Sequence, residues 1–256
     1  GQEHFYLEGQ VALAKPSEED GVEVWTSSQH PTEVQHLVAS VLDVPFNQVT
    51  VQVRRMGGAF GGKESQAAAL ACVAALAATK TRRAVKYRMR RREDMTRTGK
   101  RHDVESNVEL GIDESGIIQA ASIQLSARCG YSTDLSEGIV DRAMFHADNA
   151  YSLGDACIEG EILKTNTVSH TAFRGFGGPQ GMLAIESAME TAARHVGEDP
   201  LLFRLKNLYR PGRHVTPYGQ DVGAHPLKEI MESLRVTARY EARRQAIAEH
   251  NERRGR

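Results

Sequence analysis

The sequence predicts an α+β fold of mixed sheets with packed helices, and two observations lead to that prediction. First, strand-like segments are joined partly by turn-rich hairpins and partly by helical segments, without a regular βαβ alternation. Second, the 256 residues are 40% hydrophobic and 25% charged, which is typical of a globular protein with one large core or two smaller ones. Low-complexity, collagen-like and disordered classes are therefore excluded.

The first part of the chain is predicted to run strand, helix, strand, loop, helix. Val22–Trp25 is a predicted strand, and Val49–Val53 alternates apolar and polar side chains as a half-buried strand does. Between them, Pro31–Leu42 has apolar residues at helical spacing and proline at its first position. A glycine-rich segment, Met56–Gly62, follows the second strand, and we call it the first glycine loop. An alanine-rich helix is expected from about Glu64 to Thr79.

The rest of the chain is predicted to mix strands and helices. Val85–Arg90 alternates apolar and basic side chains, which indicates a strand with a basic outer face. Val104–Leu110 and Ile117–Ser126 flank the turn cluster Asp113–Gly116 and are typical of a hairpin. The remaining expected elements are, in order, a helix Val140–His146, a strand Ile158–Leu163, a second glycine loop Arg174–Pro179, a helix Gln180–His195, a loop Arg210–Gly223 and a charge-rich helical segment.

Charge gives no general attraction for polyanions. There are 32 Lys and Arg residues against 33 Asp and Glu, a net charge of -1, so we expect no nucleic acid and no membrane among the partners. Lys80–Arg101 has eleven basic residues against two acidic ones, which leaves a nucleic-acid binder open as an alternative. The alternation of Lys86, Arg88 and Arg90 is also what the solvated face of a strand shows. The apolar stretch Ala67–Ala78 is shorter than the ~20 residues of a membrane span, so it is predicted to be a buried helix.

Cysteine use and the N-terminus indicate the compartment. Cys72, Cys129 and Cys157 are isolated in sequence, with no C-x-x-C pair, which favours reduced thiols and a cytoplasmic location. Residues from Gly1 onward lack the basic start and apolar run of a secretory signal. Because no initiator Met is present, we expect a fragment of a longer chain.

The two glycine loops are candidate binding elements. Each lies between a strand and a helix and contains Phe-Gly-Gly, at 60–62 and 176–178. Glycine there lets the backbone approach a ligand closely and directs free N–H groups at an anion. A pair of tight turns without a ligand is the alternative.

The first glycine loop also fits the opening of a nucleotide-binding P-loop. Gly57 and Gly62 have the required spacing, and Lys63 follows directly. The next residue should be a Ser or Thr that holds Mg²⁺, whereas here it is Glu64, whose carboxylate repels a triphosphate. A nucleotide triphosphatase is therefore disfavoured.

Four segments resemble signatures of the xanthine dehydrogenase/oxidase family of molybdenum hydroxylases. They are Gly1–Glu8 (GQEHFYLE), Arg55–Glu64 (RMGGAFGGKE), Asp141–His146 (DRAMFH) and Thr171–Gly181 (TAFRGFGGPQG). The resemblance implies a molybdopterin-binding domain of the aldehyde oxidase/xanthine dehydrogenase type over residues 1–256. It would form the first half of the molybdenum-binding region of the large chain or subunit, with 210–256 as a loop and helical extension.

This resemblance also implies an activity. Family members of this kind oxidise hypoxanthine or xanthine toward urate in purine catabolism, at a molybdenum–molybdopterin centre that takes its oxygen from water. Electrons leave through 2Fe-2S clusters and FAD to NAD or oxygen. The iron–sulfur and FAD parts are expected in other segments or subunits, together with the remaining molybdenum-binding segment, in a higher oligomer.

The resemblance places some residues at the cofactor. Gln29 would hydrogen-bond an oxygen ligand of the molybdenum, and the backbone at Phe60 and Gly61 would approach its apical oxo ligand. Arg174 would bind the cofactor from the second glycine loop, its alternative being a salt bridge that only holds the loop. Gln29, Phe60 and Arg174 would surround the metal without being direct ligands.

Other residues would contact the substrate. Glu64 would accept from, or share a proton with, a purine ring nitrogen, while Arg142 would neutralise negative charge on the purine carbonyl. Phe176 would stack against the ring. In this family, aldehyde-oxidising members lack the Glu and Arg pair that purine-oxidising members have, so the resemblance favours a purine over an aldehyde. A related molybdenum hydroxylase that acts on an aldehyde or another heterocycle remains an alternative.

One component of the expected chemistry has no match in the chain. The family's glutamate base lies in a Gly-Glu-Pro-Pro-like segment, and the similar Gly197–Pro200 is better interpreted as a helix junction, with Glu198 at the boundary. The isolated chain is thus expected to be inactive. A cofactor-free scaffold or interaction domain derived from this family remains an alternative.

Overall fold

The computed structural model describes residues 2–255, apart from the side chain of Glu19, and it has the predicted α+β fold. Gly1 and Arg256, the ends of the expected domain, lie outside the described residues. The chain forms two compact units, which we call the first and second unit. The first unit comprises residues 1–107, 124–147 and 158–183, and the second comprises 108–123, 148–157 and 184–256.

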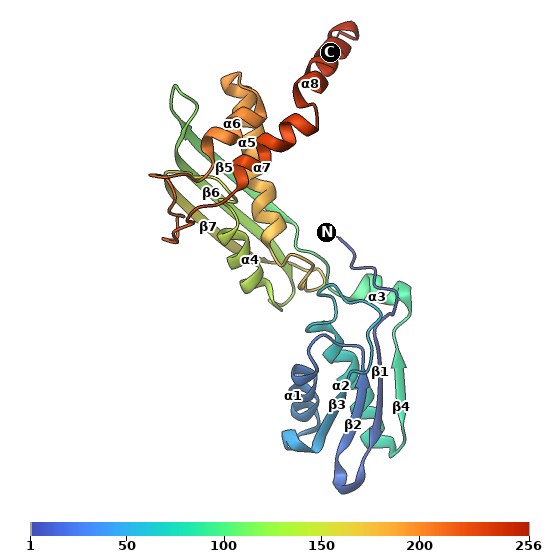
Figure 1. Cartoon of the computed structure of the whole chain (residues 1–256). Coiled ribbons are helices and arrows are strands. Elements are labelled where there is room, and N and C mark those ends of the chain that lie inside the picture. The colour runs from blue at the N-terminus through green and yellow to red at the C-terminus, as the bar shows by residue number, and fades with distance from the viewer. Residues whose placement is uncertain (1, 256) are drawn as a thin grey trace. The chain divides into compact units, whose positions relative to one another are not determined.

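A four-stranded mixed sheet forms the base of the first unit (Figure 1). Its strands lie in the order β3-β2-β1-β4, with β1 antiparallel to β2 and β4, and β2 parallel to β3. Leu13 of β1 lies opposite both Trp25 of β2 and Lys86 of β4. The strands are β1 (Val11–Pro16), β2 (Val22–Thr26), β3 (Val49–Gln52) and β4 (Val85–Arg88).

Helices α1 (Pro31–Leu42) and α2 (Gln66–Thr81) pack on one face of this sheet (Figure 1). Because alternate strand residues face the helices, Ala12 and Ala14 of β1 enter the same core as Val24 of β2. The alanine-rich helix α2 is buried along most of its length, as the sequence predicts. Small side chains on both elements allow the helix and strands to approach closely.

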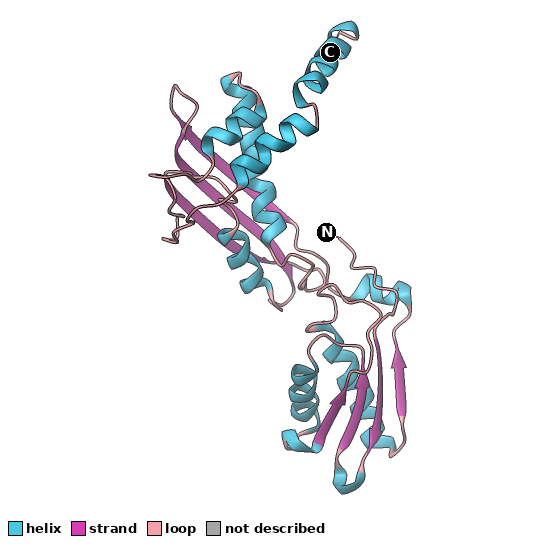
Figure 2. Cartoon of the chain, in the orientation of Figure 1, coloured by secondary structure: helices cyan, strands magenta, loops and turns pink. Residues whose placement is uncertain are grey.

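The remaining helices, strands and loops are distinguished by colour in Figure 2. Strands β5, β6 and β7 form a three-stranded sheet in that order. In the first unit, Gly160 of β7 packs against Val140 and Met144 of helix α4. These elements are η1 (Glu18–Asp20), η2 (Phe46–Gln48), α3 (Arg91–Arg97), β5 (Val104–Ile112), β6 (Ile118–Gly130), α4 (Ser136–Phe145), β7 (Asp155–Lys164), α5 (Gly178–Val196), α6 (Pro200–Asn207), α7 (Leu227–Thr237) and α8 (Tyr240–Arg253).

The second unit contains a well-capped short helix. The side chain of Asp199 accepts hydrogen bonds from the N–H groups of Leu201 and Leu202, and Pro200 begins α6. Glu198 directly precedes this cap and forms a 2.7 Å ion pair with Lys206. Glu198 is therefore a helix-boundary residue, as interpreted from the sequence.

Two kinds of difference separate the prediction from the structure. Strand β1, helix α3 and helix α6 were not predicted as elements, and α4 begins at Ser136 rather than at Val140. In α4, Ser136 and Ile139 are buried, so tertiary packing extends the helix beyond the apolar run that suggests it. Among the described residues, no helix has the length and apolar character needed to cross a membrane.

Candidate functional site

The first glycine loop has a backbone that only particular residues adopt. Gly58, Phe60 and Gly61 have φ angles of 93°, 54° and 98°. A Cβ at Gly61 would lie 2.5 Å from the carbonyl oxygen of Ala172, well inside van der Waals contact. Glycine is thus required at this position by both backbone conformation and space.

In the second glycine loop the same conformation recurs. Phe176 and Gly177 have φ angles of 45° and 90°, close to those of Phe60 and Gly61. A Cβ at Gly177 would lie 1.9 Å from the carbonyl oxygen of Ile139 in α4. The shared Phe-Gly-Gly sequence therefore corresponds to a shared backbone shape, and this loop is packed tightly on α4.

The two glycine loops contact each other directly. The N–H of Arg174 donates to the carbonyl of Phe60 at 2.9 Å. Nε2 of the buried His4 donates to the carbonyl of Ala172 at 2.7 Å, and the His4 ring lies beside Gly62. Segments more than 100 positions apart in the sequence thus meet at one place.

Gln29 lies against the first glycine loop. Its Oε1 accepts a hydrogen bond from the N–H of Gly61 at 2.8 Å and a longer one from the N–H of Lys63 at 3.4 Å. Its own N–H donates to the carbonyl of Lys63 at 2.8 Å. Within the described residues its Nε2 makes no hydrogen bond, and the side chain is exposed, so this N–H₂ group is available to a ligand oxygen.

Glu64 is half-buried and lies two residues after the end of the first glycine loop. Burial raises the pKa of its carboxyl above the ordinary value, and the negative charges of Glu33 and Asp134 act in the same direction, against the opposing effect of His30. A carboxyl with a raised pKa shares or donates a proton more readily near neutral pH.

Asp134 links the two residues that follow Glu64 to Thr171, which lies three residues before the second glycine loop. The sequence did not predict this role. Its carboxylate accepts from Ser65 Oγ at 2.8 Å, from Gln66 Nε2 at 2.7 Å and from Thr171 Oγ1 at 2.9 Å. The only local sign was an Asp in a turn just before a helix, which is common in proteins. Its role depends on partners that are distant in sequence.

Helix α4 presents Arg142 and supports Phe176. The Phe176 ring lies over Gly138, where an added Cβ would be 3.3 Å from Cε1 of the ring. Arg142 is four residues further along the helix, so it projects from the same side as Gly138. The Arg142 side chain is exposed, and its Nε donates to His146 Nε2 at 3.3 Å.

The Arg174 side chain is exposed and forms no ion pair with any described residue. The salt-bridge alternative for Arg174 is thus not what holds the loop in this structure. Instead, Arg101 donates from Nη2 to the carbonyl of Arg174 at 2.8 Å and stacks its guanidinium 4.0 Å from the Phe173 ring centroid. Arg101 is a second supporting residue that the sequence analysis did not single out.

Lys63 does not act as a P-loop lysine. Its ammonium is fully buried and points toward Glu8 and Ser27 rather than to solvent at the loop. A phosphate bound at the first glycine loop would not reach this charge without rearrangement. The three cysteines are free, and no cluster of three metal-ligating His, Cys, Asp or Glu side chains occurs among residues 2–255.

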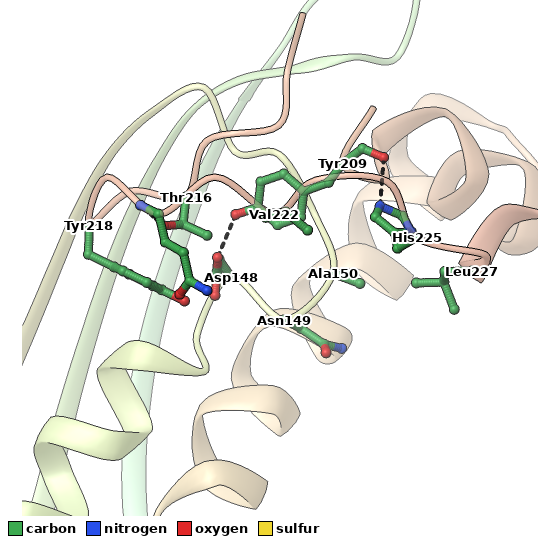
Figure 3. A pocket seen from close by; sticks show the side chains of 10 residues that line it. Asp148, Asn149, Ala150, Tyr209, Thr216, Tyr218, Val222, His225 and Leu227 are labelled. Carbon is green, nitrogen blue, oxygen red and sulfur yellow. Dashed lines mark hydrogen bonds between the residues drawn. The ribbon is translucent and has the colours of Figure 1, made fainter. Parts of the chain in front are cut away.

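A separate cavity of about 350 Å³ lies in the second unit (Figure 3). Tyr209 donates its hydroxyl to Asp148 at 2.5 Å, and its carbonyl accepts from His225 at 3.1 Å. None of the sequence-predicted site residues lines this cavity. They all lie in the first unit, so the candidate site is the junction of the two glycine loops with α4.

Comparison with known proteins identifies the fold family. The profile of the molybdopterin cofactor-binding domain matches residues 1–208. Xanthine dehydrogenase of Drosophila subobscura is 42% identical over 251 residues, which are 98% of this chain and 19% of that protein. Nicotinate hydroxylase hnxS of Emericella nidulans is 42% identical over 255 residues, again 98% of this chain and 19% of that protein. The chain thus spans about a fifth of the length of these relatives.

Solved structures agree with this assignment. The aldehyde oxidoreductase of Desulfovibrio gigas superposes with a TM-score of 0.84 at 29% identity, covering 94% of this chain and 26% of that one. Quinoline 2-oxidoreductase of Pseudomonas putida 86 superposes with a TM-score of 0.85 at 24% identity, covering 98% of this chain and 33% of that one. The second likeness shows the shared fold alone.

Proposed function

Because this chain belongs to the molybdopterin cofactor-binding domain family, we propose that it is part of a purine hydroxylase that oxidises hypoxanthine or xanthine toward urate. The observation that supports this most is the direct contact of the two glycine loops, through the 2.9 Å hydrogen bond from Arg174 N to Phe60 O. That contact gathers the candidate cofactor residues Gln29 and Gly61 beside the second loop, which contains Phe176.

The residues present fit a cofactor rich in oxygen atoms. The free Nε2 of Gln29 and the unpaired guanidinium of Arg174 are exposed hydrogen-bond donors. Bound there, molybdenum–molybdopterin supplies a two-electron oxidation with water as the source of oxygen. We place the remaining molybdenum-binding segment, the 2Fe-2S clusters and FAD in other segments or subunits, with NAD as the electron acceptor.

Three side chains are proposed to act on the substrate. Glu64, with its raised pKa, shares a proton with a purine ring nitrogen and so orients the ring. Arg142, exposed on α4, stabilises negative charge on the purine carbonyl. Phe176 stacks on the ring from its position over Gly138.

The general base is proposed to come from outside this chain, so the chain alone would not turn over substrate. We accordingly propose one domain over residues 1–256, acting within a larger oligomeric enzyme. A cytoplasmic location is proposed because Cys72, Cys129 and Cys157 are free thiols.

The test uses the complete enzyme that contains this chain. Glu64→Ala and Arg142→Ala should each lower kcat/KM for xanthine at least ~10-fold, since each removes a polar contact to the substrate, while molybdenum per enzyme stays unchanged. Arg88→Ala, at an exposed position of strand β4, is the matched control and should leave both quantities unchanged. Loss of molybdenum from either site variant would place that residue at the cofactor instead, and unchanged kinetics would refute its role.

A second candidate is a hydroxylase of another nitrogen heterocycle. The 42% identity to nicotinate hydroxylase hnxS of Emericella nidulans equals that to the fly xanthine dehydrogenase, so identity alone does not separate the two substrates. Nicotinate and hypoxanthine should be compared at equal concentration with the same enzyme preparation. A higher kcat/KM for nicotinate would replace the purine assignment.

A further inference from the structure

The candidate cofactor residue Gln29 and the candidate substrate residue Glu64 are both attached to one buried lysine. We propose that Lys63 is a positioning residue that fixes Gln29 and Glu64 relative to each other, through its side chain on one side and its main chain on the other. The roles of Gln29 and Glu64 rest on the proposed function, whereas the positioning itself rests on contacts within the first unit.

The side chain of Lys63 is completely enclosed. It is 0% exposed, and its Nζ donates to the carbonyl of Glu8 at 2.6 Å and to Ser27 Oγ at 2.7 Å, with Glu8 Oε2 at 3.4 Å. The ring of Tyr6 lies 4.5 Å from the ammonium. An ammonium has three N–H donors, and three oxygen atoms surround this one, so the buried cation is compensated.

Glu8 extends this arrangement to the start of the first glycine loop. Its Oε2 accepts from Ser27 Oγ at 2.6 Å and from the N–H of Gly57 at 2.8 Å. Its main-chain N–H donates to the carbonyl of Gly57 at 3.2 Å. The cation at Lys63 therefore stabilises a half-buried carboxylate that holds the opposite end of the loop. Because the Lys63 ammonium is fully buried, loss of the Glu8 carboxylate would leave a buried charge without its partner.

The main chain of Lys63 holds the segment around Gln29. Its carbonyl accepts from the N–H of Gln29 at 2.8 Å and from Ser28 Oγ at 3.3 Å. The same three-residue segment 27–29 is thus bound twice, at Ser27 by the ammonium and at Gln29 by the backbone. Because Glu64 is the next residue in the chain, a displacement of Lys63 moves Glu64 and Gln29 together.

A solvent-facing lysine would not produce this coupling. Lys86 on β4 is exposed and forms no ion pair with a described residue, so it is a suitable matched control. Replacing lysine by methionine keeps a similar chain length but removes the charge and the three N–H donors. At Lys63 this leaves the Glu8 carboxylate without its cation, whereas at Lys86 it removes only a solvated charge.

The experiment compares Lys63→Met with Lys86→Met in the complete enzyme. The first readout is amide hydrogen exchange of residues 57–64 and 27–29, which does not depend on activity. We expect Lys63→Met to accelerate exchange there at least ~10-fold, with no change in Lys86→Met. If exchange is unchanged in Lys63→Met, the positioning role is refuted.

The second readout is the pH profile of kcat/KM. Loosening of the loop hydrates Glu64, which removes the burial that raises its pKa. Because Glu64 is proposed to act through a proton that it shares with the substrate, the basic limb of the profile, where that proton is lost, should move to lower pH. A displacement near 1 Å is expected to lower kcat/KM up to ~100-fold. A lysine with a purely structural role would lower the unfolding midpoint without moving the basic limb, and that result would overturn the proposal.

A gentler variant covers the case in which Lys63→Met does not fold. Ser27→Ala removes one of the acceptors and keeps the charge, so it should give the same changes in exchange and in pH profile at smaller size. Faster exchange at 57–64 in an enzyme that does not oxidise purines would uphold the positioning by Lys63 and refute the proposed function. Unchanged exchange in an enzyme that oxidises xanthine would refute the positioning by Lys63 and uphold the proposed function.

Discussion

Substituting alanine for Gly61 tests whether the junction of the two glycine loops is necessary. The added Cβ would lie 2.5 Å from the carbonyl oxygen of Ala172, whereas ordinary contact begins at 3.4 Å. The loops must therefore separate by about 0.9 Å, the difference between these distances. This movement would stretch the hydrogen bond from Arg174 N to Phe60 O beyond its present 2.9 Å.

The expected cost has two parts. A φ of 98° at a residue with a side chain costs about 1–3 kcal/mol, and loss of the inter-loop hydrogen bond costs about 1 kcal/mol. The free energy of unfolding should thus fall by about 2–4 kcal/mol, the sum of these two figures. In the complete enzyme, a shift of about 1 Å at the site should lower kcat/KM about 100-fold.

The assay measures chemical denaturation, molybdenum content and xanthine turnover for Gly61→Ala and for Gly212→Ala. Gly212 has a φ of 81° but no atom within 4 Å of its added Cβ, so it reports backbone strain without the collision. The control should lose stability by the strain alone and keep full activity. If the two variants lose equal stability and both stay active, the close approach of the loops is not important and our reasoning is refuted.

Two further predictions concern the surroundings of α4. Burial, with a smaller effect of nearby His170, lowers the pKa of His102 to about 4 from 6.5. The contribution of the neutral His102 to the free energy of unfolding is therefore complete above pH 6.5 and is lost as the pH falls toward 4, by up to about 3 kcal/mol. His102→Gln should lose less stability over that pH interval than the wild type, and an equal loss in the variant would contradict the assignment. Gly138→Val should raise KM for the purine roughly 10-fold, because the added Cβ would lie 3.3 Å from the Phe176 ring, and molybdenum content should stay unchanged. Glu137→Val, at the exposed neighbouring position, is the control. A normal KM in Gly138→Val would remove Phe176 from the substrate site.

Strand β1 illustrates where sequence patterns failed. Val11–Pro16 contains two alanines and ends in proline, which are poor indicators of a strand. The structure nevertheless makes it an internal strand, between β2 and β4. The small side chains of Ala12 and Ala14 are suited to close packing against the alanines of α2, which is a property of the packed pair and not of either segment alone. Helix α1, whose spacing and proline are local signals, has the predicted bounds.

The sequence by itself determined the α+β class, the bounds of helix α1 and, through its motifs, the family, and it supplied the candidate residues of the site. Those features depend on neighbours a few positions apart, whose periodicity and turn chemistry are visible in the chain. Only the tertiary structure decided that Lys63 points inward to Glu8, that Asp134 binds Ser65 and Thr171, and that the two glycine loops touch. Each of these contacts joins residues dozens of positions apart, and burial makes them strong because water no longer competes for the same donors and acceptors.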